Sequence, residues 1–485
     1  MLKKPLHIIM NDTAVKFYLI AGVILFLWAV VCAYFPWYQS LIMLIAFLSG
    51  VLILVRPEIA VYLMAILVPL FGNRLGFYFD FTQIGLKTSK TIPFYQLFLL
   101  FGVVSIYFRK TSCLEERRSF SNPLPFTAAL LFGFYAFLSL SWAPFQNYSK
   151  VVFYFVVMNF AIYYLVPSVV SNERIHRRLM VFWVIAGIVI SVLTVLSYDN
   201  IPEKEFFAKR VASWATFIFN TTTEIKYRGH GIGHPNNTSL TLNMAFFITL
   251  GLFIADKSVR RRILLGAAGL FILFADLLTA SKGGIGSLLL AFYFFCIFSS
   301  TIRKKTFKYL VAAHVVVVLL LSLSILYTAT NRTPRLLKTS YRGQTVSLDN
   351  RYEIWNAGLD QMKRRNLLLK GLGPGGFERS TEYPHAHSHI FSFFFDYGIA
   401  GLLFVVVFYV SFLVFYWKFI QKNRVQESYS QIMSLAFIAG TVAVVIHGTI
   451  DHNYVKSVIW LFFAMAVATI RLHNNSALSS DNKSF

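Results

Sequence analysis

The sequence predicts an all-α, polytopic membrane protein with about 12–14 transmembrane helices and a large extracytoplasmic loop that contains an amphipathic helix. Three observations predict this fold class. Apolar runs near the bilayer-spanning length of roughly 20 residues recur along the chain. The 485 residues are 57% hydrophobic and only 14% charged, whereas soluble proteins average about 25% charged residues. Basic clusters, finally, occupy alternate loops.

The apolar runs place each expected span in order. The run at 58–73 is short for a span, and 37–73 allows another arrangement, so the count stays a range. The expected spans are 16–35, 37–55, 58–73, 91–108, 125–143, 149–169, 178–197, 238–255, 263–280, 284–301, 309–329, 390–417, 430–449 and 456–471.

The basic clusters predict the orientation of these spans, because short cationic loops stay on the cytoplasmic side. This rule places residues 1–15 and the tail 472–485 in the cytoplasm, with 16–471 as the transmembrane domain. The clusters are Arg109-Lys110 with Arg117-Arg118, Arg174 with Arg177-Arg178, Lys257 with Arg260-Arg261-Arg262, Arg303-Lys304-Lys305 with Lys308, and Lys418, Lys422 and Arg424.

The formal charge of +24 is explained by this topology signal and by contact with anionic lipid head groups of the bilayer. No stacking platform or basic groove motif accompanies the charge, so we expect no nucleic-acid partner. The three cysteines have no paired spacing, which predicts neither a metal site nor a disulfide framework.

The intervening loops then lie outside, and the two long ones are 198–237 and 330–389. A long loop without secondary structure is uncommon unless it is functional. Residues 350–365 have a helical pattern, with Asp349 or Asn350 as the cap. We expect this amphipathic helix on the outer membrane surface or over the mouth of a cavity. Its apolar stripe is Ile354, Trp355, Leu359 and Met362. After Arg471 we expect a disordered tail.

Two cations in outer loops are candidate anion ligands. Arg228 precedes a glycine-rich stretch that ends at Pro235 and starts the next span, and its planar fork suits phosphate oxygens. Lys282 stands in a minimal outer turn before two glycines that open a helix, where backbone donors favour an anion. The alternative for each is an interfacial side chain that extends its charge to water.

Histidines supply the candidate base. His385, His387 and His389 alternate directly before an apolar segment. A neutral imidazole suits general-base work near neutral pH. Metal ligation is the alternative, but no Cys or carboxylate cluster accompanies them in the same loop. His230 and His234, near Arg228, are a further and weaker candidate metal pair.

Three separated blocks resemble the O-antigen ligase and O-antigen polymerase superfamily of bacterial membrane glycosyltransferases. The family's late loop reads roughly Arg-x-x-x-Trp, Gly-x-Gly-x-Gly-x-Phe, then His-Asn/Ser with a glycine eleven positions after the histidine. Here Arg351 with Trp355, residues 371–377, His387 and Gly398 are similar to it. That spacing selects His387 among the three histidines.

The other two blocks lie earlier in the chain. Residues 228–236 resemble the family's Arg-x-x-Gly…Pro-Asn block, and 281–283 resemble its Ser-Arg-Gly turn. Lys282 replaces the usual arginine there, which keeps the charge but loses the bidentate fork. The resemblance covers residues 225–465.

The resemblance implies glycan transfer from an undecaprenyl-diphosphate-linked donor to a sugar hydroxyl, in the cytoplasmic (inner) membrane with the site on its extracytoplasmic face. It implies that His387 accepts the hydroxyl proton while Arg228, Lys282 and Arg351 hold the diphosphate, with no metal and no cofactor. The partners it suggests are the lipid-linked donor, a glycan acceptor, a flippase and chain-length proteins.

Two functional alternatives stay open. Within the family, a ligase would transfer finished glycan to lipid A-core, whereas a polymerase joins repeat units. The long N-terminal portion and the lysine at position 282 favour the polymerase. A transporter or flippase would use a similar basic cavity, but the sequence has no repeated pair of broken helices, and Asp276, an acidic residue well inside a late span, gives little support for a coupled proton path.

Overall fold

The computed structural model describes the greater part of the chain, and the predicted spans from 58–73 to 284–301 and from 390–417 to 456–471 each coincide with a helix. The spans 16–35 and 309–329, and most of 37–55, lie outside the described residues. The described ranges are 48–71, 76–80, 89–112, 123–197, 231–232, 234–299, 339–341, 344–346, 348–383, 385–422, 428–449, 451 and 456–481.

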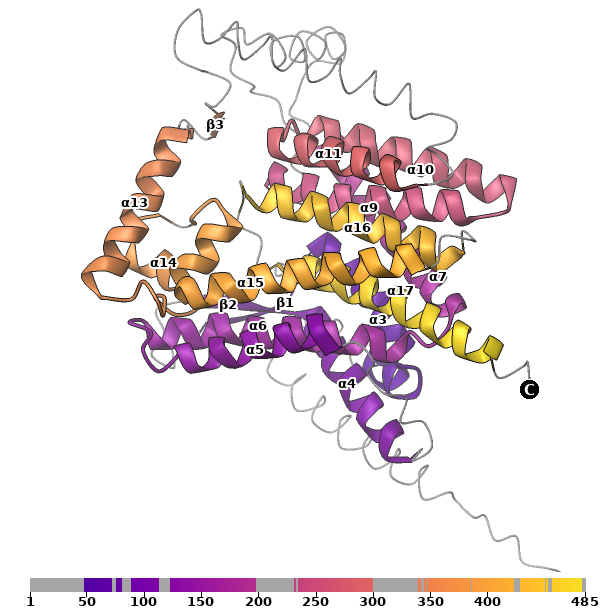
Figure 1. Cartoon of the computed structure of the whole chain (residues 1–485), viewed down its shortest axis with the longest axis horizontal. Helices are drawn as coiled ribbons and strands as arrows, with labels where there is room; N and C mark the ends of the chain where they lie inside the picture. The colour runs from indigo at the N-terminus through magenta and orange to yellow at the C-terminus, as the bar shows by residue number, and fades with distance from the viewer. Residues whose placement is uncertain are drawn as a thin grey trace, which may run out of the picture.

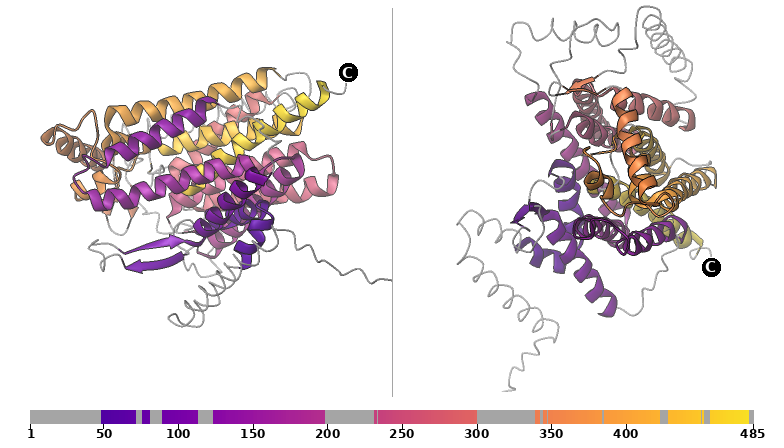
Figure 2. Two further views of the ribbon diagram at one scale, coloured as in Figure 1. Left: turned by 90° about the horizontal axis from the view of Figure 1, so that it is seen from below. Right: turned by 90° about the vertical axis from the view of Figure 1, so that its left-hand side faces the viewer.

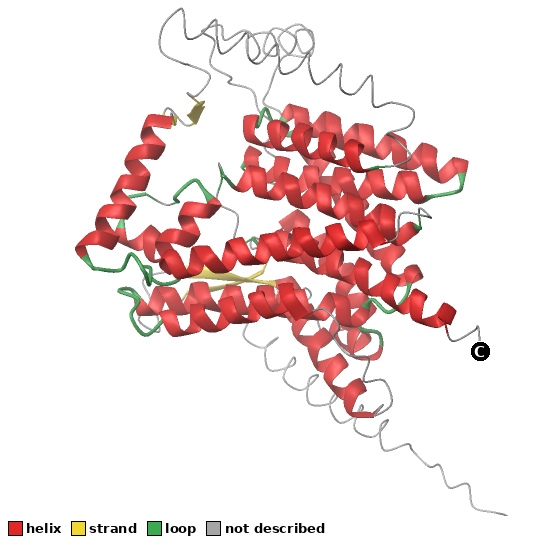
Figure 3. Ribbon diagram, in the orientation of Figure 1, coloured by secondary structure: helices red, strands yellow, loops and turns green. Residues whose placement is uncertain are grey.

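The helices run back and forth as one bundle (Figure 1), and Figure 3 shows how little of the described chain is anything else. Their bounds are α3 Glu58–Phe71, α4 Phe94–Ser112, α5 Pro123–Ser139, α6 Gln146–Val169, α7 Glu173–Leu196, α9 Pro235–Ala255, α10 Val259–Leu278, α11 Lys282–Phe298, α13 Leu348–Arg364, α14 Gly376–Ser380, α15 His389–Lys422, α16 Tyr429–Gly448 and α17 Ser457–Asp481.

Length and composition of these helices confirm a polytopic membrane protein. Among the described residues, α6, α7, α9, α16 and the stretch His389–Val414 of α15 are long and apolar enough to cross a membrane. α3, α4, α5, α11 and α17 contribute shorter apolar stretches. In α9 and in α16, 72% of the most apolar stretch is buried inside the protein, whereas in α15 the buried share is 39%. α9 and α16 therefore form the centre of the bundle and α15 its periphery.

Two short antiparallel hairpins add to the helices. β1 (Gly76–Asp80) pairs with β2 (Ser89–Pro93), Gly76 opposite Pro93, and β3 (Thr339–Tyr341) pairs with β4 (Gln344–Val346). Aromatic and β-branched residues in these segments favour the extended backbone. The β1–β2 hairpin projects toward the same end of the bundle as α13 (Figure 2).

Two of the predicted basic clusters lie at the same end of the bundle. At the start of α16, the Arg177 guanidinium lies 3.9 Å from the centre of the Tyr429 ring. The Tyr429 hydroxyl shares a hydrogen bond of 2.7 Å with Nδ1 of His176. The connection from α9 to α10, which carries Lys257, lies at this same end, opposite α13 and α14 (Figure 1). The other end of α16 leads to Asp451.

The predicted amphipathic helix forms, but its apolar stripe packs on protein. α13 begins at Leu348, so Asp349 and Asn350 lie in its first turn instead of capping it. Ile354 and Met362 are buried in a small core with Phe377 of α14 and Phe395 of α15. α14 and the start of α15 therefore cover the stripe, so protein packs against this apolar face.

α17 is longer than the span predicted for it. It continues to Asp481, beyond the point at which we expected a disordered tail. Once a helix has started, each further residue adds a hydrogen bond at low cost, so the helix extends past its apolar part.

A break at Gly398 divides α15 into two arms. Gly398 has φ 68° and ψ −165°, a region that is essentially restricted to glycine. A Cβ atom on Gly398 would overlap the backbone carbonyl of Leu369. The Ile399 N–H donates to the Leu368 carbonyl at 3.1 Å, so the chain before the glycine-rich segment docks directly on the break.

We expect Gly398→Ala to lower the stability of the purified protein by about 2 kcal/mol or more, because it combines a forbidden backbone conformation with a backbone overlap. The control is Gly286→Ala in α11, where a Cβ meets nothing within 4 Å and alanine favours the helix. Thermal unfolding in detergent should show a lower midpoint for the first variant only. Equal unfolding midpoints for the two variants would contradict the requirement for glycine at position 398.

Candidate active site

The glycine-rich segment is held in place by one buried carboxylate, Asp396. Its Oδ2 accepts a hydrogen bond from the Gly375 N–H at 3.0 Å, and its Oδ1 accepts one from the Phe377 N–H at 3.1 Å. The Asp396 carbonyl accepts a third from the Gly373 N–H at 2.8 Å. The turn that leads into α14 is thereby fixed to the first arm of α15.

His387 lies directly before this arm, in a short loop clamped from two sides. The Trp355 indole N–H donates to the Ala386 carbonyl at 2.8 Å, and its ring stacks on Phe391 at 4.2 Å. On the other side of His387, the Ser388 hydroxyl accepts a hydrogen bond from the Phe391 N–H at 3.4 Å. Ser388 thus caps α15, which explains why a serine suits the position after the histidine.

The backbone of His387 itself is unusual. Its φ is +48°, a left-handed conformation uncommon for residues other than glycine. Such strain persists only where the surroundings enforce it, and it concentrates at functional sites. The contacts at Ala386 and Ser388 supply that enforcement, so the backbone at His387 is held in this conformation.

The side chain of His387 is half-buried between charges of both signs. Burial lowers the pKa of His387 below its ordinary value, the Asp451 carboxylate opposes this shift, and His385 and Arg351 add to it. The net result is a lowered pKa. At neutral pH the ring is therefore neutral and able to accept a proton.

Arg351, in the first turn of α13, shares the same carboxylate. Burial lowers the pKa of its guanidinium, and the charge of Asp451 acts in the opposite direction. Because an arginine starts from a very high pKa, Arg351 remains a cation. Asp451 thus acts electrostatically on both Arg351 and His387, although it lies a hundred residues beyond the first of them.

Asp451 and Lys456 connect this loop to the bundle. The Lys456 ammonium lies 3.8 Å from the Asp451 carboxylate and donates to the Asn237 side-chain oxygen at 2.5 Å. Asn237 belongs to the first turn of α9. The connection between α16 and α17 therefore joins the His387 loop on one side to the start of α9 on the other.

Lys282 enters the same region through the start of α11. Ser281 caps that helix by accepting a hydrogen bond from the Gly284 N–H at 3.2 Å. Its hydroxyl donates to the Asn236 side-chain oxygen at 3.0 Å. Asn236 and Asn237 are neighbours, so the starts of α9, α11 and α17 meet at one end of the bundle, where half-buried Lys282 is the first residue of α11.

The remaining predicted residues are placed as follows. Arg228 and His230 lie outside the described residues. His234 caps α9, where its Nδ1 accepts a hydrogen bond from the Asn236 N–H at 3.3 Å. His385 is exposed, with its ring nitrogen 3.7 Å from the Glu378 carboxylate.

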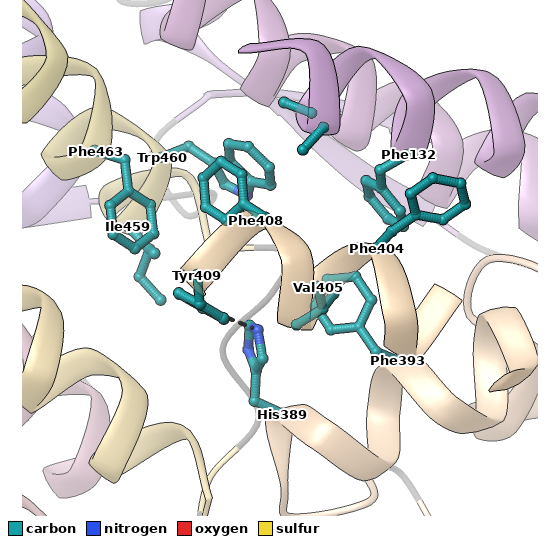
Figure 4. Close-up of a pocket in the computed structure, with 12 residues that line it drawn as sticks. Phe132, His389, Phe393, Phe404, Val405, Phe408, Tyr409, Ile459, Trp460 and Phe463 are labelled. Carbon is teal, nitrogen blue, oxygen red and sulfur yellow. Dashed lines mark hydrogen bonds between the residues drawn. The ribbon is translucent and has the colours of Figure 1, made fainter. Parts of the chain in front are cut away.

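His389 faces away from this charged cluster. Its ring lines a small apolar pocket of about 30 Å³ between α5, α15 and α17. There it shares a hydrogen bond of 3.1 Å with the Tyr409 hydroxyl (Figure 4). Within the residues that the structure describes, no three His, Cys, Asp or Glu side chains gather in a way that could hold a metal ion.

Three residues of this end were missed in the sequence: Asp396, Asp451 and Lys456. Asp451 and Lys456 stand in the short connection between the last two spans, which the alternation of basic loops places on the same side as His387. That placement was the available signal. Asp396 lies within an aromatic run of α15, and an acid buried in an apolar segment is itself a signal of a specific partner.

Comparison with known families agrees with the resemblance seen in the sequence. Residues 267–406 match the O-antigen ligase family. The matched segment contains Lys282, Arg351 and His387, and it ends before Asp451 and Lys456. No curated protein matches the chain.

Proposed function

We propose that this chain, which matches the O-antigen ligase family over residues 267–406, is a metal-independent glycosyltransferase that polymerises the repeat units of a surface or cell-wall polysaccharide. The donor is a glycan linked to undecaprenyl diphosphate, and the acceptor is a sugar hydroxyl. One observation carries the proposal. His387 and Arg351 both lie within the electrostatic reach of Asp451, at the end where α9, α11 and α17 begin.

His387 acts as the general base in this proposal. Its lowered pKa leaves the ring neutral at neutral pH, and hydrogen bonds at Ala386 and Ser388 hold its backbone in place. The acceptor hydroxyl gives its proton to the imidazole as its oxygen forms a bond to the anomeric carbon of the donor. The bond from that carbon to the phosphate oxygen breaks, and undecaprenyl diphosphate leaves with the bonding electron pair.

Cations stabilise the charge that develops on the leaving diphosphate. Arg351 offers a guanidinium fork that matches phosphate oxygens. Lys282, at the first position of α11, offers a point charge at the positive end of the helix dipole. The family resemblance adds Arg228 to these diphosphate-binding cations. Lys456 is a further cation at this end, and its ammonium lies 3.8 Å from the Asp451 carboxylate.

The arrangement of the basic loops supports the proposed location of the site. The basic loops, represented by Arg177 and Lys257, lie at the end opposite the candidate site. Because cationic loops stay in the cytoplasm, we place the site on the extracytoplasmic face of the cytoplasmic membrane, with both termini inside. A lipid-linked donor presents its diphosphate at that face, and a flippase and chain-length proteins are the expected partners.

The direct test uses purified protein with lipid-linked repeat units. We expect His387→Ala to reduce glycan transfer by roughly 10²–10⁴-fold, the range for loss of a general base. Arg351→Ala, Lys282→Ala and Arg228→Ala should each reduce it as well. His385→Ala, two residues from the base and exposed, is the matched control and should retain transfer.

Full transfer by the His387 variant would remove it from the base role. The products also separate the two family activities. A ladder of chain lengths identifies a polymerase, whereas transfer of intact chains to lipid A-core identifies a ligase.

The pH dependence of kcat/KM tests the coupling between His387 and Asp451. Activity should rise with pH as the free imidazole forms, with a midpoint below the ordinary histidine pKa of about 6.5. Asp451 stabilises the imidazolium, so its replacement in Asp451→Asn should move the midpoint to still lower pH. Glu382→Gln, an exposed change in the same loop, should leave the midpoint in place. A midpoint that moves upward in Asp451→Asn would exclude this coupling.

A further inference from the structure

A second pocket opens beside the candidate active site, between the end of α3 and the starts of α9 and α17. Its interior volume is about 190 Å³, which is smaller than the roughly 300–1,000 Å³ of a pocket that encloses a whole small ligand, so it can hold only part of a larger molecule. The pocket differs in kind from the one in Figure 4, which is lined by aromatic and aliphatic side chains and holds no cation.

The wall of this second pocket has two chemically distinct parts. One part is apolar and includes Leu70 and Phe71 of α3 and Leu240 of α9. The other is polar and consists of Asn237, Thr241, Lys456 and Ser457. Phe71 is 39% exposed, so the apolar part continues to the outer surface of a helix that is itself apolar.

Lys456 gives the polar part a fixed positive charge. Its ammonium is held by the Asn237 oxygen at 2.5 Å and by Asp451 at 3.8 Å, and the side chain is only 22% exposed. An ammonium held away from bulk water interacts more strongly with an anion than an exposed one does. An anion that also carries an apolar chain would satisfy both parts of the pocket at once.

We infer that this pocket binds the lipid-phosphate end of the donor, with Lys456 paired to a phosphate and the α3–α9 wall holding the first part of the isoprenoid chain. The inference rests on the proposed function and deepens it. Lys456 shares Asp451 with His387 and Arg351, so a phosphate at Lys456 lies next to the proposed reaction centre. The chain leaves past Phe71 toward the bilayer.

The binding of a short isoprenoid phosphate tests the assignment of this pocket without requiring glycan transfer. The probe is farnesyl phosphate, titrated calorimetrically into the purified full-length protein, with farnesol and inorganic diphosphate as partial ligands. We expect Lys456→Met, which keeps the apolar stem, to weaken the binding of farnesyl phosphate by about tenfold or more. The same variant should leave the binding of farnesol unchanged. Lys370→Met, at a lysine on the same end whose ammonium lies 5.7 Å from the Trp142 ring, is the matched control and should bind like the wild type.

A second variant keeps the test informative if Lys456→Met fails to fold. Leu240→Trp fills the apolar part of the pocket without changing its charge, and it should weaken the binding of both farnesyl phosphate and farnesol. The inference is overturned if Lys456→Met or Leu240→Trp binds farnesyl phosphate as the wild type does. It is also overturned if inorganic diphosphate binds as tightly as farnesyl phosphate, or if phosphatidylglycerol displaces the probe equally well.

The outcomes separate this inference from the proposed function. Wild-type protein that transfers glycan while Lys456→Met keeps full affinity for farnesyl phosphate contradicts the pocket assignment alone. Wild-type protein that binds farnesyl phosphate through Lys456 and yet transfers no glycan contradicts the enzymatic proposal alone.

Discussion

The electrostatics of the candidate site depend on one buried carboxylate, Asp451. Burying cations without a compensating charge is costly, and this end of the bundle brings Arg351 and Lys456 together with His387. Asp451 acts on all three. It offsets part of the positive charge and leaves an excess that suits a diphosphate. The same carboxylate joins the loop of α13 to the connection between α16 and α17, and through Lys456 to the start of α9.

Geometry is supplied by a second carboxylate and by a break in one helix. Asp396 fixes the turn into α14, and Gly398 lets the chain before the glycine-rich segment dock on the backbone of α15. Ser388 caps the first arm, and Trp355 holds Ala386. These contacts surround His387 and enforce its positive φ. The conformation of the loop and the unusual backbone of His387 are therefore maintained by the same set of hydrogen bonds.

Local patterns in the sequence predicted most of the fold and part of the site. Apolar length placed the spans, and the 3.6-residue period of Ile354, Leu359 and Met362 placed α13, because both signals act within one helix. Family spacing selected His387 and Arg351. Asp451 and Lys456 escaped prediction because their partners lie far away in sequence and the family match ends at residue 406. The surface on which α13 packs could not be predicted for the same reason. Periodicity shows that an apolar stripe will be covered, but it does not show which element covers it.

The most direct test of this account is the position of a bound donor. A cryo-electron microscopy structure of the protein in lipid nanodiscs, with a non-hydrolysable lipid-diphosphate glycan, would locate the head group. We expect its diphosphate within hydrogen-bonding distance of Arg351 or Lys456, with the His387 ring facing the anomeric carbon from the side opposite the phosphate. A diphosphate bound instead among Arg260, Arg261 and Arg262, at the other end of the bundle, would contradict the account.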